Sequence, residues 1–419
     1  MTEYLLVKNL IEAHPNRKNS FKVISKPTQY GDEIEQSYIP PTSLPADKAV
    51  QIAIHNEILR KFNFCPLVRG EISVSLEEFK NSNIEDLYSQ IFSRGLDDES
   101  RPFVWPYLLN VIPFNFSESE VHQRLQNLLN EYLKIFNQFH YITSFQRKSS
   151  QAVKDMMTVI ENDVIRNDRQ LPAFCEGSPN LDVLRHVLIT YSLYNRDSGY
   201  VQGMCDIVSP FILLYIKKWE GDKALFFDGS IKTQQETESF VFWNFVGLME
   251  LTRQDLIFID LSKSQEFVLS KTMEIIKEIH KPLYKLLEEE GVSNIIFMFR
   301  PIILLFKREF KYNEIFRLWD SIITAKNSAY PRFIAAALLI LIYPKFLLHT
   351  KGHVEHFMMI MNEYLEKTNV NSVLNLTNAL CDEIEKVTKN DQKKRKQILK
   401  PLHKETRLCD YQPIYMKIN

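Results

Sequence analysis

Apolar side chains recur at intervals of three and four residues, almost without interruption, between about residues 85 and 348. This is the spacing of helices that bury one face. Clusters of Asn, Asp, Ser, Gly and Pro separate the periodic segments. Two of the clearest stripes are Val121, Leu125, Leu128, Leu129 and Leu133, and Leu181, Leu184, Val187, Leu188 and Tyr191. No strand-rich block appears, so the pattern predicts an all-α main body.

The segments that flank this body are less regular. Residues 1–85 form a predicted N-terminal extension of unassigned role, with a linker near 39–45 where the prolines of I-P-P-T-S-L-P interrupt regular structure. One helix is predicted after Asp47 by an apolar stripe, Val50, Ile54, Ile58, Leu59 and Phe62. The polar run D-G-S-I-K-T-Q-Q-E-T-E at 228–238 predicts a mobile surface loop. We therefore place the main domain at 86–348 and a helical C-terminal segment with a basic tail at 349–419.

The composition agrees with a soluble helical protein. Only 11 of 419 residues are glycine, which is too few for turn-dense β architecture. The longest apolar run, F-I-A-A-A-L-L-I-L-I-Y at 333–343, stops at Pro344 and is shorter than the ~20 residues that cross a bilayer, so we expect a buried helix. Five scattered cysteines without a C-x-x-C pair indicate a reducing compartment. The first ten residues lack the pattern of a secretory signal peptide.

The charges are balanced overall but not locally. Lys and Arg number 51 against 52 Asp and Glu, which disfavours nucleic acid as a partner. Residues 386–400 are strongly basic. This tail would suit a peripheral contact with an anionic membrane, a solvated helix end, or a nuclear-import signal around K-K-R-K.

The chain carries no recognisable catalytic motif of its own. Neither G-x-x-x-x-G-K-[ST] nor G-x-G-x-x-G occurs, and the nucleophile elbow G-x-S-x-G is also absent. His349 and His353 stand four apart, but not in the H-E-x-x-H order of a zinc site. We therefore expect no cofactor and no metal on this chain.

Two stretches have a more specific pattern. In M-M-T-V-I-E-N-D-V-I-R-N-D-R-Q-L-P at 156–172, Asp163 and Arg166 are three apart, so the carboxylate can hold the guanidinium in one orientation. In S-G-Y-V-Q-G-M at 198–204, Gln202 lies between two glycines just before an apolar helix. Taken alone, each stretch is more often a surface ion pair or a solvated amide than a functional site.

Together, I-E-N-D-V-I-R at 160–166 and Y-V-Q-G-M at 200–204 resemble the paired signatures of TBC-domain proteins, the activators of Rab GTPases. Three further matches occur in family order: R-G-L-D-D-E-S-R-P-F-V-W-P-Y-L-L at 94–109, F-R-P-I-I-L-L-F-K-R-E-F at 299–310 and L-W-D at 318–320. The resemblance covers about residues 94–348. It implies an all-helical fold of two lobes with the active groove between them. Within the family, the sequence is similar to the branch whose members often act on late-endosomal or vacuolar Rabs.

The resemblance also implies roles for individual residues. Arg166 matches the arginine finger, which neutralises charge on the GTP of a bound Rab, and Gln202 matches the glutamine finger, which positions water. The implied supporting residues are Asp163 to orient Arg166, Tyr200 to fix the glutamine loop, and Gly203 to let the GTPase backbone approach. For the other family matches, core packing and buried ion pairs are the favoured interpretation over contact with the GTPase: Arg101, Trp105, Arg300 and Trp319.

The sequence departs from the family pattern at two positions. Asn167 stands where threonine is usual, and Pro301 stands where tryptophan is common. The implied activity is acceleration of GTP hydrolysis in trans, in the cytoplasm at the surface of endomembranes, with GTP and Mg²⁺ supplied by the Rab. The alternative is a scaffold that binds a Rab through the same groove without accelerating hydrolysis.

Overall fold

The computed structural model describes residues 45–62, 73–143, 145, 149–349, 354–365 and 368–400. The predicted linker at 39–45 lies outside these residues except for Pro45, and His353 lies outside them as well. The α-helices are α3 (Ala46–Lys61), α4 (Leu76–Asn81), α5 (Ile84–Arg94), α6 (Arg101–Leu108), α7 (Glu118–His140), α9 (Gln151–Val164), α10 (Pro179–Tyr194), α11 (Met204–Tyr215), α12 (Gln234–Thr252), α13 (Gln254–Ile257), α14 (Leu261–Ile279), α15 (Lys281–Glu289), α16 (Phe299–Ile303), α17 (Tyr312–Thr324), α18 (Tyr330–His349), α19 (Val354–Leu365), α20 (Val370–Val387) and α21 (Gln392–Ile398). Two 3-10 helices are η2 (Pro172–Phe174) and η3 (Ile296–Met298).

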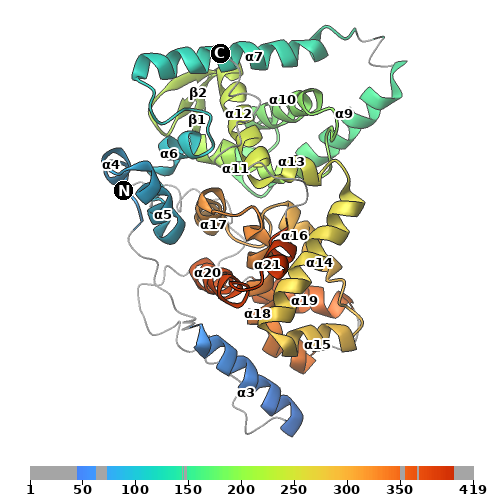
Figure 1. The fold of residues 1–419 in the computed structure, drawn as a ribbon. Coiled ribbons are helices and arrows are strands. Elements are labelled where there is room, and N and C mark those ends of the chain that lie inside the picture. Colours follow the sequence, from blue (N-terminus) through green and yellow to red (C-terminus); the bar gives the residue numbers. More distant parts are fainter. Residues whose placement is uncertain are drawn as a thin grey trace.

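The helices form two lobes (Figure 1). In the first lobe, α6 to α13, helices α7, α10 and α12 pack against one another, and α11 packs on α10 and α12. In the second lobe, α14 to α21, helix α18 lies between α14 and α20. The all-α prediction is confirmed, and the predicted stripe on α10 is buried from Leu184 to Tyr191.

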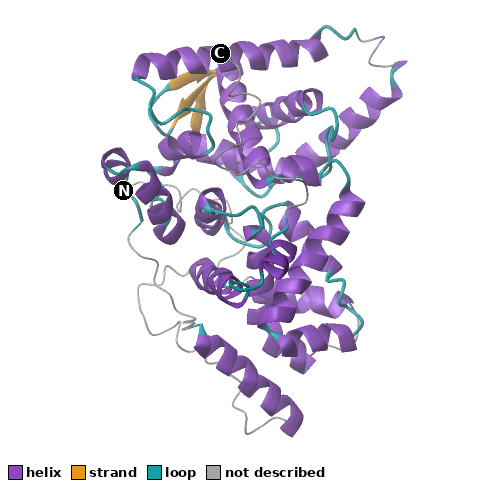
Figure 2. Cartoon of the chain, viewed as in Figure 1, coloured by secondary structure: helices purple, strands orange, loops and turns teal. Residues whose placement is uncertain are grey.

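A small antiparallel sheet, β1 (Ile216–Glu220), β2 (Lys223–Phe226) and β3 (Ile231–Thr233), lies beside α7 and α12 (Figure 2). The predicted surface loop at 228–238 is therefore wrong, because it contains β3 and the first turns of α12. The sequence signal was T-Q-Q-E at 233–236: the Thr233 hydroxyl accepts from the Glu236 N–H, and the Glu236 carboxylate accepts from the Thr233 N–H. Behind this capping box, Glu238 is buried.

The predicted helix after Asp47 is present as α3, but its buried face only partly matches the predicted stripe. Val50 is 60% exposed and Ile54 is 41% exposed, while Ile52 and His55 are buried. His55 Nδ1 lies 3.0 Å from His280 Nε2. Leu59 and Phe62 of the predicted stripe pack against the core, so the apolar stripe was right at its end and wrong at Val50 and Ile54.

Helix α18 is the centre of the second lobe. It is long and apolar enough to cross a membrane by length and composition, but 78% of its apolar window is buried inside the protein. The sequence-based expectation of a buried helix at 333–343 is confirmed, since every residue from Phe333 to Ile340 is buried. Pro344 lies within the helix and does not end it.

The N-terminal boundary predicted at residue 85 falls inside α5. This helix packs against α17 of the second lobe, and Val74 pairs with Leu96 in an isolated parallel bridge. Residues 73–94 are thus packed onto the main body in the structure.

Candidate functional site between the lobes

Helix α9 positions Arg166 at the surface. The helix begins at Ser150, whose hydroxyl accepts from the Val153 N–H, and it ends at Val164, so Arg166 stands on the turn that follows. The guanidinium donates through Nε to the Asn162 carbonyl at 2.6 Å and through Nη2 to Asp163 Oδ1 at 2.7 Å. Its side chain is 62% exposed. Arg166 therefore has a defined orientation and still faces solvent.

Asp163 joins this turn to the glutamine loop. Its side chain is 6% exposed, and its second oxygen, Oδ2, accepts from the Tyr200 hydroxyl at 2.6 Å and from the Gly203 N–H at 3.1 Å. Burial, with smaller contributions from Cys205 and Asp163, holds the pKa of Tyr200 far above its usual value. The phenol is therefore a proton donor to Asp163 at neutral pH.

The glutamine loop ends at the N-terminus of α11. Gln202 is exposed on a turn, and Gly203 is the N-cap residue with φ +100°. The helix is anchored by the buried residues Met204, Ile207, Val208, Phe211 and Leu214, as its sequence pattern predicts. The exposed amide thus stands on a turn that is fixed by a core helix.

Gly203 has a structural reason within the chain, in addition to the role that the resemblance implies. A Cβ atom at this position would lie 3.1 Å from Leu304 Cδ2, at the end of α16. Gly203 is buried against its own chain, and the expectation that it makes room for a GTPase backbone stays a prediction. The glycine is required by its positive φ and by the close approach of the second lobe.

A second group of charges, which sequence reasoning missed, lies behind the two turns. Asp168 accepts from Lys307 Nζ at 2.6 and 2.7 Å, from the Ser209 hydroxyl at 2.9 Å and from the Tyr312 hydroxyl at 2.5 Å. Burial alone would raise the pKa of Asp168, but the Lys307 ammonium and the Tyr312 and Ser209 hydroxyls together outweigh burial and hold the pKa below its usual value. Asp206 accepts from Lys307 at 3.2 Å and from Arg308 Nε at 2.9 and 3.0 Å.

Three of the four remaining family matches lie in the core. Arg101 and Trp105 both donate to Asp320, at 3.0 and 2.8 Å, and Trp319 donates to the Leu305 carbonyl at 2.9 Å. The rings of Trp105 and Trp319 stack with centroids 6.1 Å apart. Arg300 is different, because its side chain is 57% exposed and only reaches Glu309 at 3.7 Å.

The two departures from the family pattern are both buried. Asn167 donates through Nδ2 to Asp168 Oδ2 at 3.1 Å, and within the described ranges its Oδ1 has no hydrogen-bond partner. The carbonyl of Pro301 accepts from the Phe306 N–H at 2.7 Å, which closes a turn whose residues Leu305 and Phe306 have positive φ. Asn167 thus lies on the turn that carries Arg166, and Pro301 begins the segment that carries Leu304 and Lys307.

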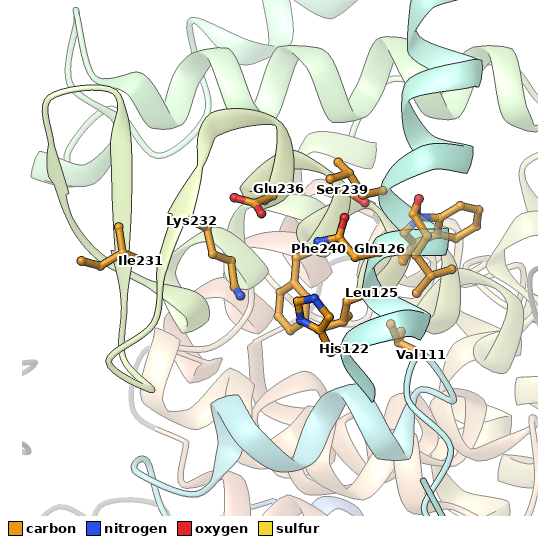
Figure 3. Close-up of a pocket in the computed structure, with 12 residues that line it drawn as sticks. Val111, His122, Leu125, Gln126, Ile231, Lys232, Glu236, Ser239 and Phe240 are labelled. Carbon is orange, nitrogen blue, oxygen red and sulfur yellow. Dashed lines mark hydrogen bonds between the residues drawn. The ribbon is translucent and has the colours of Figure 1, made fainter. Parts of the chain in front are cut away.

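A cavity of about 150 Å³ lies elsewhere in the first lobe, between α7, β3 and α12 (Figure 3). Its polar lining comes from His122, Gln126, Lys232, Glu236 and Ser239. None of the residues around Arg166 or Gln202 lines it. Over the described part of the chain, no group of three or more His, Cys, Asp or Glu side chains could hold a metal ion. Arg166 and Gln202 are both exposed at the protein surface, away from this cavity.

Fold and site together define a helical protein that presents an exposed arginine and an exposed glutamine from two turns that both contact the Asp163 carboxylate. The sequence profile of the Rab-GTPase-TBC domain matches residues 98–348, and the chain belongs to this family. The profile ends at the same residue as the main domain predicted from sequence, 348.

Relatives and a solved structure agree with the family. TBC1 domain family member 17 of Mus musculus is 27% identical over 305 residues, 72% of this chain and 44% of the relative. GTPase-activating protein GYP7 of Candida glabrata is 29% identical over 310 residues, 68% of this chain and 38% of the relative. The chain therefore spans less than half the length of these relatives. The crystal structure of the Ypt/Rab-GAP domain of Gyp1p superposes with a TM-score of 0.59 at 21% identity, over 78% of this chain and 98% of that domain, and supports the fold.

Proposed function

We propose that this chain accelerates GTP hydrolysis by a Rab-family GTPase in its GTP form. Arg166 supplies positive charge to the phosphates, and Gln202 positions the attacking water. The observation that carries the proposal is the Asp163 carboxylate, which holds the Arg166 guanidinium on one oxygen and the backbone of the Gln202 turn on the other. Both side chains are exposed, so a partner can reach them.

The chemistry explains why two side chains are needed. A GTPase alone hydrolyses GTP slowly, and an arginine supplied in trans is worth ~10³ to 10⁵ in rate. Holding water in the reactive orientation adds a second contribution, which depends on a rigidly held amide. The Rab would supply the nucleotide and Mg²⁺, and this chain would supply the two side chains.

A single-turnover hydrolysis screen over purified, GTP-loaded Rabs tests this function. We expect the wild-type chain to accelerate at least one Rab, Arg166→Ala to lose ~10³-fold or more of the acceleration, and Gln202→Ala to lose ~10²-fold. Arg169→Ala is the matched control, because Arg169 is an exposed arginine three residues further along. Its rate should equal that of the wild type.

The alternative is a Rab-binding scaffold that uses the same surface. A scaffold would bind a GTP-loaded Rab and leave its hydrolysis rate unchanged. If Arg166→Ala keeps full activity while Arg169→Ala loses it, the assignment of the arginine is wrong. Binding measured alongside hydrolysis separates these outcomes.

We also propose that the chain works in the cytoplasm, peripherally bound to an anionic endomembrane. Residues 386–400 contain seven Lys and Arg against one Asp, a formal charge of +6 in a chain of net charge -1. Lys394 pairs with Glu278 at 2.6 Å and Arg395 with Glu385 at 3.3 Å. The other five basic side chains are exposed: Lys386, Lys389, Lys393, Lys396 and Lys400. Each can contribute ~1 kcal/mol near anionic lipid.

A further inference from the structure

The buried ammonium of Lys307 lies where the two lobes meet. Its side chain is 4% exposed, and its Nζ contacts two buried carboxylates, Asp168 and Asp206. A fully buried lysine is rare unless it is paired. Asp168 follows Arg166 by two residues, and Asp206 lies in the first turn of α11, four residues after Gln202. One cation of the second lobe therefore contacts the segments that carry both fingers.

The backbone at Asp168, where Lys307 makes this contact, has a strained conformation. Asp168 has φ +49°, a left-handed conformation that is unfavourable for residues with a side chain, although Asp adopts it more readily than most. The carboxylate offsets this cost by accepting from Lys307, Ser209 and Tyr312. The conformation of the turn after Arg166 thus depends on side-chain contacts from elsewhere in the chain.

The two carboxylates differ in what remains if the ammonium is removed. Asp206 would keep its contacts with Arg308, whose side chain is 48% exposed. Asp168 would keep only hydroxyl donors and the Asn167 amide, with a second carboxylate close by. Like charges in a buried site repel, so removal of the Lys307 ammonium would destabilise mainly the turn that carries Arg166.

We propose that Lys307 is a positioning residue for the two fingers. Its ammonium pairs with Asp168 and Asp206 at once and thereby fixes the Arg166 turn against the N-terminus of α11. The same segment places Leu304 against Gly203, so the second lobe supports both turns within four residues. The inference rests on the proposed function for its effect on rate, but its structural part does not need a partner.

The structural part is tested by hydrogen exchange on the isolated chain. In Lys307→Met, which removes the charge and keeps much of the length, the amides of 163–170 and 200–206 should exchange ~10-fold faster or more. Those in α10 and α12 should be unchanged. Lys271→Met is the matched control, because Lys271 is also buried and paired, with Glu274 at 2.7 Å on α14. Unchanged exchange at both finger segments, or faster exchange throughout the chain, would overturn the inference.

The rate part is tested in single-turnover hydrolysis with the Rab that the wild type accelerates. We expect Lys307→Met to lower the maximal rate ~10 to 100-fold with less than a threefold change in the half-saturating concentration, since a displacement of about 1 Å can cost 10²-fold. In the Arg166→Ala background the same change should lose less, because only the part of the effect that acts through the Gln202 turn remains. Equal losses in both backgrounds would contradict a positioning role.

The two parts also separate failure of this inference from failure of the proposed function. If the wild type accelerates no Rab, the function fails while the exchange result still decides the role of Lys307. Lys307→Arg keeps the charge and should recover most of the protection at 163–170. If Lys307→Arg exchanges as fast as Lys307→Met, the shape of the lysine side chain, and not its charge, fixes the turn.

Discussion

At the scale of single residues, the site depends on contacts that bring distant positions within one hydrogen-bond length. Asp163 reaches Gly203 across 40 positions, and Lys307 reaches Asp168 across 139. The sequence predicted Arg166, Gln202 and Asp163 because short motifs with fixed spacing mark them. Lys307 and Asp168 could not be paired from sequence, since no local spacing links two residues that meet only when the lobes pack.

Gly203→Ala tests the structural reason for this glycine, which is its positive φ and its contact with Leu304. The new Cβ would meet Leu304 at 3.1 Å, in a residue with φ +100°. We expect the free energy of unfolding to fall by about 1 to 2 kcal/mol. Single-turnover hydrolysis should slow ~10-fold or more, because Gln202 immediately precedes the strained residue. Thermal unfolding and the hydrolysis rate measure the two effects.

Gly177→Ala is a matched control for the backbone strain. Gly177 has φ +81°, but an added Cβ would meet nothing within 4 Å. Gly177→Ala should lower the free energy of unfolding without lowering the maximal hydrolysis rate. If Gly203→Ala retains the wild-type rate, the position of Gln202 does not depend on the contact with Leu304.

At the scale of helices, the hydrophobic periodicity predicted where the helices lie in the sequence better than it predicted which face of each helix is buried. Helix α3 is where the sequence placed it, yet Val50 and Ile54 point away from the core. His55 is buried, and hydropathy counts a histidine as polar. Likewise, the sheet at 216–233 escaped notice because its strands are three to five residues long.

The contact between His55 and His280 makes the docking of α3 sensitive to acid. The Leu283 N–H donates to His280 Nδ1 at 3.0 Å, so His280 Nε2 carries the proton that is donated to His55. Burial lowers the pKa of His55 to about 4 and that of His280 to about 3, from 6.5. The neutral pair stabilises the fold above pH 6.5, and this contribution is lost as the pH falls toward 4.

We expect thermal unfolding to move to lower temperature between pH 6.5 and 4. If one proton is counted, the free energy of unfolding is lower by about 3 kcal/mol at pH 4 than above pH 6.5. His55→Gln should weaken this pH dependence, because an amide oxygen can still accept from His280 but does not titrate in this range. Hydrogen exchange of Ala46–Lys61 is the local readout. Equal pH dependence in the variant and the wild type would exclude His55 as the source.

At the scale of the whole molecule, the fold was predicted by the resemblance and not by counting helices. Periodicity alone gives an all-α body, and many arrangements share that description. The two lobes meet through side chains such as Trp105 and Trp319, which are 214 positions apart. Such contacts have no signature in a single sequence except through known relatives.

The distribution of charge over the molecule predicts selective membrane binding. Replacing Lys386, Lys389, Lys393, Lys396 and Lys400 by glutamine should abolish cosedimentation with vesicles that contain 30% phosphatidylserine. Hydrolysis of Rab-bound GTP in solution should be unchanged, because none of these residues contacts the finger turns in the described structure. Phosphatidylcholine vesicles are the lipid control, and binding should weaken as salt rises.

Lys394→Gln with Arg395→Gln is the protein control, since these two side chains are already paired with Glu278 and Glu385. It removes two charges and should retain most of the vesicle binding. If the fivefold variant binds anionic vesicles as tightly as the wild type, the exposed lysines are a solvated surface.

Helix α18 has a consequence for how the protein is made. Twenty residues of this hydropathy match the thickness of a bilayer, and α14 and α20 are two of the helices that cover them. Because α20 is the later of the two to leave the ribosome, the nascent chain exposes a stretch that insertion machinery and chaperones both recognise. A fragment cut at residue 348, where the family profile ends, would keep this exposed surface permanently and would aggregate.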